Sequence, residues 1–131
     1  MKISYTKIFV KNQAEALDFY TEIVGFVKKA DVVQGQYRWL TVVSPDDQSG
    51  TELVLEKNSD PAAKAFQKAI FEQGNVAANF NVEDVQTEYQ RLKMLGVNFT
   101  MEPTEVMPGV TIAIFDDTCG NLIQIQKTPD K

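Results

Sequence analysis

The sequence contains no histidine, and this absence restricts its chemistry more than any residue that is present. Without histidine there is no Ser-His-Asp triad, no Cys-His dyad and no imidazole metal ligand. The single cysteine, Cys119, excludes an intramolecular disulfide and a thiolate cluster for zinc or iron-sulfur. The composition therefore excludes a protease with such a triad or dyad and a typical zinc enzyme, and it favours the cytoplasm.

Closely spaced glycines and long apolar runs are also missing. The seven glycines are never closer together than Gly25 and Gly35, so neither a P-loop nor a dinucleotide-binding fingerprint is present. The longest purely apolar run extends from Ile112 to Phe115, whereas a membrane span needs about 20 residues. No apolar stretch of secretory length follows Met1. We expect a soluble, cytoplasmic protein with no membrane partner.

The charge balance is acidic, with 13 Lys and Arg residues against 18 Asp and Glu residues and a net charge of -5. This charge repels a phosphate backbone, so we expect no nucleic-acid partner. Hydrophobic residues make up 44% and charged residues 24%, as in globular proteins. A chain of 131 residues with no linker-like segment predicts a single domain over 1–131.

Hydrophobic spacing predicts two similar halves, each a strand, a capped helix and three strands. In the first half the strands are expected near 3–10, 26–33, 37–43 and 51–56, with a helix from Asn12 to Gly25. In the second they are expected near 75–82, 97–101, 110–115 and 121–126, with a helix from Asp84 to Gly96. A helix over about 60–73, with Pro61 in its first turn, connects the halves.

The registers of the two halves agree. Val10-Lys11-Asn12 aligns with Val82-Glu83-Asp84, and Gly50 aligns with Gly120. The predicted fold is therefore α+β, with two βαβββ modules, about 1–57 and 75–131, that curl into an incomplete barrel around a cleft. A ferredoxin-like βαββαβ sandwich is the alternative, and it leaves two strands unused.

The sequence resembles the vicinal oxygen chelate superfamily, which contains glyoxalase I, bleomycin-resistance proteins and extradiol dioxygenases. The residues that carry this resemblance are Leu17-Asp18-Phe19-Tyr20, Gly25-Phe26, Arg38-Trp39-Leu40, Glu52-Leu53-Val54-Leu55-Glu56, Val82-Glu83-Asp84-Val85, Leu95-Gly96-Val97, Glu102-Pro103-Thr104 and Phe115-Asp116-Asp117-Thr118-Cys119-Gly120-Asn121. The last stretch departs from the usual F-x-D-P-D-G-N turn at Thr118 and Cys119. We interpret Cys119 as a loop thiol that could be exposed.

The resemblance also implies where metal ligands would lie. In metal-dependent members they come from the first and last strand of each repeat, and the matching positions here are Tyr5, Val54, Ala77 and Gln124. None is a histidine or a carboxylate, and the nearby Glu52 alone is insufficient for a tight site. The sequence therefore predicts no metal and no other cofactor, so the glyoxalase and dioxygenase activities are not implied.

Strand alternation predicts which residues line the cleft. One strand face packs on the helices, and the opposite face mixes aromatic, amide and charged groups that suit an organic ligand. The predicted ligand-binding residues are Tyr5, Lys7, Phe9, Trp39, Glu52, Val54, Asn79, Leu122 and Gln124. The pattern does not decide whether Tyr37 and Trp39 or Arg38 and Leu40 face the cleft, although we favour the aromatic pair. The alternative is a solvated sheet face without a ligand.

The leading functional hypothesis is a metal-free protein that binds a small organic molecule and sequesters an aromatic or cationic compound. A metal-independent lyase or isomerase is the first alternative, with Glu52 as general base and Tyr5 or Lys7 as its partner. An interaction protein with a decayed site is the second. The resemblance also implies a homodimer.

Overall fold

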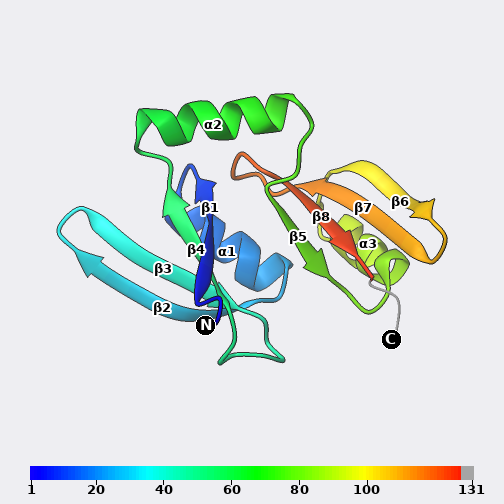
Figure 1. Cartoon of the computed structure of the whole chain (residues 1–131), viewed down its shortest axis with the longest axis horizontal. Helices are drawn as coiled ribbons and strands as arrows, with labels where there is room; N and C mark the ends of the chain where they lie inside the picture. The colour runs from blue at the N-terminus through cyan, green and yellow to red at the C-terminus, as the bar shows by residue number, and fades with distance from the viewer. Residues whose placement is uncertain (128–131) are drawn as a thin grey trace. The chain divides into compact units, whose positions relative to one another are not determined.

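The computed structural model describes residues 1–127 (Figure 1). The chain divides into two compact units, residues 1–66 and 67–131, with the boundary inside helix α2 (Pro61–Glu72). Each unit contains one βαβββ module, which confirms the α+β fold and the repeat. That the two modules act as a single domain stays a prediction. No helix of the described residues is long and apolar enough to cross a membrane.

Module 1 consists of β1 (Tyr5–Val10), α1 (Gln13–Asp18), the π-helical turn η1 (Phe19–Ile23), β2 (Val27–Gln34), β3 (Tyr37–Val43) and β4 (Glu52–Lys57). Its sheet has the order β1-β4-β3-β2, with β1 and β4 parallel and the other pairs antiparallel. The predicted helix from Asn12 to Gly25 is thus only partly regular, because the N–H of Val24 bonds the carbonyl of Phe19, five residues earlier.

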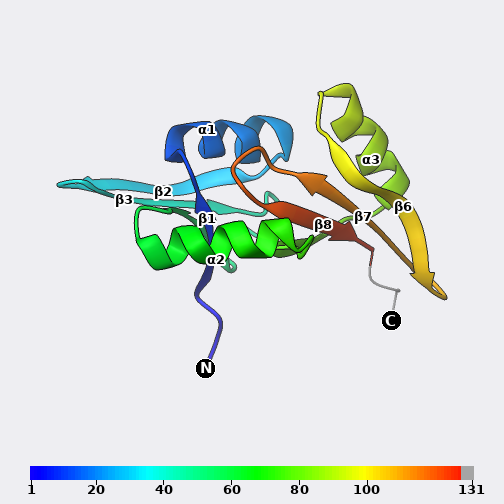
Figure 2. The same cartoon turned by 90° about the horizontal axis from the view of Figure 1, so that it is seen from above.

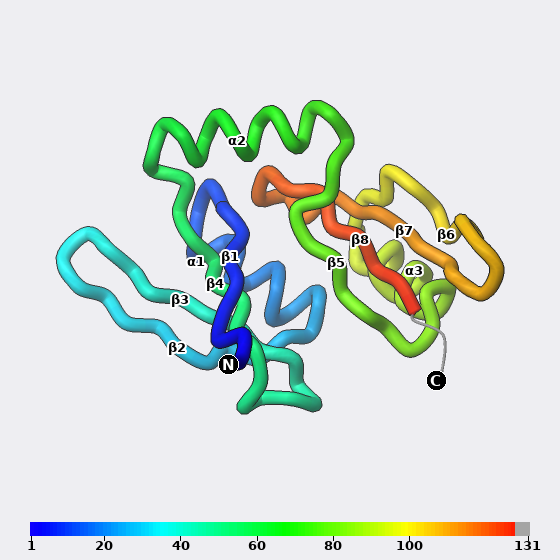
Figure 3. The backbone as a smooth tube through the Cα atoms, viewed as in Figure 1, coloured from blue at the N-terminus to red at the C-terminus, as the bar shows by residue number. Residues whose placement is uncertain are grey.

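Module 2 consists of β5 (Ala78–Asn81), α3 (Val85–Met94), β6 (Phe99–Met107), β7 (Val110–Asp116) and β8 (Leu122–Gln126). Its sheet order, β5-β8-β7-β6, repeats that of module 1. Figure 3 shows the long β2–β3 and β6–β7 hairpins that form the outer half of each sheet. Neither sheet closes on itself in the described chain, and β6 extends beyond the predicted 97–101 with register shifts on either side of Pro103.

The core of each module lies between its helix and one face of its sheet, and Figure 2 shows α1 along one face of the first sheet. The fully buried side chains there include Val10, Leu40, Leu55 and Tyr20. Burying each such aliphatic side chain stabilises the module by about 1.5–3 kcal/mol. In module 2 the ring of Phe99 on β6 contacts the ring of Tyr89 on α3 and the ring of Phe115 on β7. These contacts join α3 to β6 and β7.

Candidate functional site

We call the face of the first sheet that points away from α1 the distal face of module 1. The register pairs Tyr5 with Glu52 and Lys7 with Val54 across β1 and β4, and Thr41 with Val54 across β3 and β4. Because directly paired residues share a sheet face, alternation assigns the rest. The distal face carries Tyr5, Lys7, Phe9, Tyr37, Trp39, Thr41, Glu52, Val54 and Glu56. All six of the site residues predicted in this module therefore share one face.

An aromatic pair crosses the middle of the distal face. The rings of Tyr5 and Trp39 meet edge to face, with centroids 5.2 Å apart and an interplanar angle of 88°. The two residues come from β1 and β3, on either side of β4, so their rings meet over that strand. Val54 of β4 is 1% exposed, whereas Tyr5 is 50% exposed. Val54 is thus covered, and Tyr5 offers an aromatic surface.

Two carboxylates flank the aromatic pair, and each accepts a hydrogen bond from a hydroxyl group of β3. Thr41 Oγ1 donates to Glu52 Oε1 over 2.7 Å, and the Tyr37 hydroxyl donates to Glu56 Oε2 over 3.4 Å. Removal from water, together with the negative charge of Glu56, raises the pKa of Tyr37. The distal face therefore combines apolar rings with oriented acidic groups.

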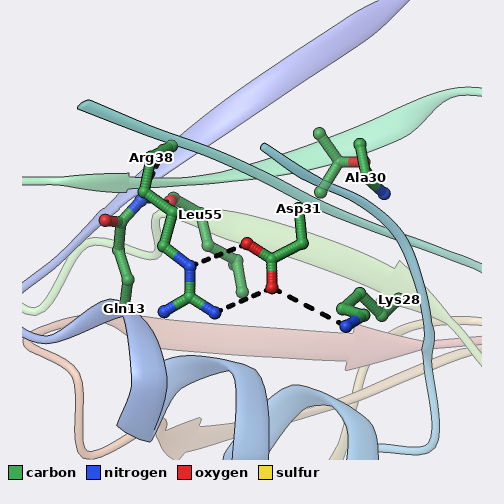
Figure 4. A network of polar contacts seen from close by, with 7 residues as sticks. Gln13, Lys28, Ala30, Asp31, Arg38 and Leu55 are labelled. Carbon is green, nitrogen blue, oxygen red and sulfur yellow. Dashed lines mark hydrogen bonds and ion pairs between the residues drawn. The ribbon is translucent and has the colours of Figure 1, made fainter. Parts of the chain in front are cut away.

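The structure also shows that Arg38 and Leu40, rather than Tyr37 and Trp39, lie on the side of β3 that faces α1. Arg38 points to the side of α1 (Figure 4), where its guanidinium makes two 2.9 Å hydrogen bonds to the carboxylate of Asp31. The Gln13 amide of α1 donates to the carbonyls of Arg38 and Leu55. The hydrogen bond from Arg38 lowers the pKa of Asp31, while the same carboxylate raises the pKa of Arg38. Tyr37 and Trp39 therefore lie on the distal face, and that this face lines the cleft stays a prediction.

Module 2 places its predicted residues on the corresponding sheet face. Asn79 pairs with Gln124 across β5 and β8, and the N–H of Ala77 bonds the carbonyl of Leu122. The Gln124 amide donates to Gln126 Oε1 over 3.4 Å. Leu122 is 6% exposed, and Asn79 is exposed. This face carries amide and aliphatic groups where module 1 carries aromatic rings and carboxylates.

A separate cavity of about 370 Å³ lies in module 2. Its walls come from the start of α3, the β6–β7 hairpin and the end of β8, and they are formed by Asp84, Val85, Gln86, Pro103, Glu105, Gly109, Thr111 and Lys127. No predicted site residue lines it. The Asp84 carboxylate is already occupied by the N–H of Thr87, which it accepts over 2.8 Å as the cap of α3.

Cys119 lies in the loop before β8, as the sequence predicts, but the expectation that its thiol could be exposed is wrong, because this residue is only 4% exposed. The buried carboxylate of Asp117 accepts the backbone N–H groups of Cys119 and Asn121 and so draws the loop inward. The Gln67 amide donates to the carbonyl of Cys119, which fixes the loop against α2. A buried cysteine in a closed turn is a packing residue rather than a reactive thiol.

Residues 2–125 match the Glyoxalase/Bleomycin resistance protein/Dioxygenase superfamily. The chain belongs to this superfamily. It is 63% identical over 125 residues to the protein YurT of Bacillus subtilis (strain 168), an alignment that covers 95% of this chain and 98% of YurT.

Two solved structures extend the comparison within the superfamily. UcmS2 is 32% identical, with a TM-score of 0.85 and 98% of both chains covered. TnmS3, an antibiotic binding protein from Streptomyces sp. CB03234, is 26% identical, with a TM-score of 0.76 and coverage of 98% of this chain and 97% of that one.

The residues at the superfamily's metal-ligand positions do not fit a divalent metal ion. By the resemblance, Tyr5 and Val54 correspond to two of these positions in module 1, and Ala77 and Gln124 to the others in module 2. Two aliphatic side chains, a phenol and a neutral amide do not make a tight site. Among residues 1–127, no group of three or more His, Cys, Asp or Glu side chains could hold a metal ion.

Sequence reasoning missed Thr41 and Glu56 as members of the distal face, and it favoured Tyr37 for this face together with Trp39 without including Tyr37 among the ligand-binding residues. Their signal was the period of two along the strands, because Tyr37 and Thr41 lie two residues on either side of Trp39. Once Trp39 is assigned to the distal face, both follow. Glu56 follows from Val54 in the same way.

Proposed function

We propose that this protein binds a small aromatic or cationic organic compound on the distal face of module 1 and sequesters it without a metal or other cofactor. The observation that carries the proposal is the Tyr5–Trp39 pair, an aromatic surface beside the Glu52 and Glu56 carboxylates. Edge-to-face rings held by strands form a rigid contact surface, so little entropy is lost when a flat ligand binds. The likeness to TnmS3, an antibiotic binding protein, supports the same class of function.

The proposal extends to the remaining predicted residues and to the assembly. On module 1, Lys7, Phe9 and Val54 are proposed as further ligand-binding residues. On module 2, Asn79, Leu122 and Gln124 are proposed as ligand-binding residues of its own corresponding face. We also propose that the protein works in the cytoplasm as a homodimer.

The test is isothermal titration calorimetry with a panel of planar aromatic metabolites and antibiotics, repeated in EDTA. For any compound that binds, Trp39→Leu is expected to raise the dissociation constant about tenfold, because it removes the larger ring of the pair. Phe66→Leu is the matched control, since Phe66 is a 60% exposed aromatic residue on α2 rather than on the distal face. Equal losses in both variants, or no binding across the panel, would contradict the proposal.

Product analysis of the same mixtures separates binding from catalysis. Turnover of a bound compound that is abolished by Glu52→Gln would instead support the metal-independent enzyme with Glu52 as general base. Binding without turnover agrees with sequestration.

A further inference from the structure

The pairing of β2 with β3 contains an irregularity at which a backbone N–H group bonds a side chain. The register shifts between Lys28 and Ala30, where Ala30 lies opposite Thr41. The N–H of Ala30 donates to Thr41 Oγ1 over 3.1 Å. Thr41 itself is 0% exposed. The bulge thus fixes a buried hydroxyl group in the sheet.

This arrangement determines the direction in which the Thr41 hydroxyl proton points. A hydroxyl group has one proton and accepts with its lone pairs. Since Thr41 Oγ1 accepts from Ala30, its proton is directed to Glu52 Oε1, which lies 2.7 Å away. Such a short O–H···O distance is typical of a hydrogen bond to a carboxylate. Glu52 is therefore oriented by a buried group, whereas Glu56 has a 3.4 Å bond to the exposed Tyr37.

The negative charge of Glu52 is oriented but not neutralised. The ion pairs of module 1 within the described chain join Lys28 and Arg38 to Asp31, and none includes Glu52. Lys7, on the same face, is exposed and forms none of these pairs. A half-buried carboxylate whose hydrogen-bond donor is neutral is stabilised when a cation approaches it.

The aromatic pair lies beside this carboxylate. Tyr5 pairs directly with Glu52 in the β1–β4 register, and Trp39 contacts Tyr5. Aromatic faces attract cations most strongly where water is partly excluded. A ligand with both a flat ring and a positive charge would use both features.

We infer that Glu52, held in place by Thr41 and the Ala30 bulge, selects ligands that carry a positive charge on a planar aromatic body. This inference rests on the proposed function and narrows it from aromatic or cationic compounds to aromatic cations. Thr41 acts as a positioning residue and Glu52 as the residue that contacts the cation.

The test compares two probes of nearly the same shape, 9-aminoacridine, which is protonated at neutral pH, and acridine, which is neutral. The wild-type protein is expected to bind 9-aminoacridine about tenfold more tightly than acridine. In Glu52→Gln this ratio is expected to fall to near one while acridine affinity is retained. Glu22→Gln, at an exposed carboxylate of η1 outside the distal face, is the control and is expected to keep the ratio within about twofold.

Thr41 variants test the positioning role with the same ratio. Thr41→Val removes the hydroxyl group and is expected to lower the ratio several-fold, whereas Thr41→Ser retains the hydroxyl group and is expected to restore it. A merely structural role would weaken both probes alike. If Thr41→Val does not fold, as judged by circular dichroism, Glu52→Gln still decides the question.

The outcomes separate this inference from the proposed function. Equal affinity for the two probes, with both still weakened by Trp39→Leu, would overturn the selection of cations and leave aromatic binding standing. An unchanged ratio in Glu52→Gln would also overturn it. Failure of both acridines to bind would count against it as well, while the wider panel judges the proposed function on its own.

Discussion

At the scale of single residues, Thr118 has an unfavourable backbone conformation. Its φ is 63°, and it is the one residue among 1–127 other than glycine with a positive φ. A β-branched residue in this region is strained. The Asp116 carboxylate holds it there by accepting the N–H of Thr118 over 2.7 Å. Proline has a fixed φ near -65°, so it could not occupy this position as the turn is built here.

We expect Thr118→Asn to raise the free energy of unfolding by about 0.5–1 kcal/mol, because asparagine tolerates a positive φ better than threonine. Thr118→Pro is expected to lower it. Urea denaturation followed by circular dichroism measures both. A Thr118→Asn protein that is less stable than the wild type would show that the strain argument is wrong.

At the scale of elements, the two helices that follow the first strand of each module begin with equivalent caps. Asn12 Oδ1 accepts the N–H of Glu15 over 2.9 Å, and Asp84 Oδ1 accepts the N–H of Thr87 over 2.8 Å. The backbone hydrogen bond from Thr87 lowers the pKa of Asp84. The two caps have the same geometry, but only that of α3 titrates.

The stabilisation by Asp84 is therefore expected to depend on pH. Because its pKa is lower in the folded than in the unfolded chain, the stabilisation is complete above the unfolded value of about 4 and is lost as the pH falls through the folded value. Asp84→Asn keeps a cap but removes this titration, so its Tm should fall less than that of the wild type between pH about 6 and pH about 3. Differential scanning calorimetry measures the difference.

Other carboxylates respond to acid in both proteins. Asp31, whose pKa is lowered by Arg38, is present in both the wild type and Asp84→Asn, so it contributes equally to the decrease in Tm of each protein in acid. Asp31→Asn serves as a second variant, because it removes the titration of the Asp31–Arg38 pair and leaves the cap of α3 intact. Equal acid-induced decreases in Tm for Asp84→Asn and the wild type would contradict the role of the cap.

At the scale of the whole molecule, each sheet has end strands that pair with only one neighbouring strand among residues 1–127. β2 ends the first sheet and β6 ends the second, and both carry register shifts. Such edges are commonly covered by association or protected by bulges. We expect the homodimer of the proposed function, so multi-angle light scattering should give about twice the chain mass of 14.7 kDa. A mass equal to that of one chain at high micromolar concentration would contradict this.

Local pattern determined the architecture. Alternation along the strands, the caps at Asn12 and Asp84 and the repeated register are properties of neighbouring residues, so the two βαβββ modules and the shared face of Tyr5 and Glu52 could be predicted. The metal-ligand positions were identifiable only through the resemblance to the superfamily, with the repeated register used to find the matching residues.

Only the tertiary structure decided how particular groups meet. The hydrogen bond from Thr41 to Glu52 depends on the pairing of β3 with β4, and the second bond of Thr41, from Ala30, depends on the bulge between β2 and β3. The sheet face on which the Trp39 side chain lies depends on the position of β3 relative to α1. Cys119 is buried because Asp117 and Gln67 bond its backbone, and Gln67 is distant in the sequence. Such contacts join residues through space, so their outcome depends on the register and packing of whole elements rather than on the residues beside them in the chain.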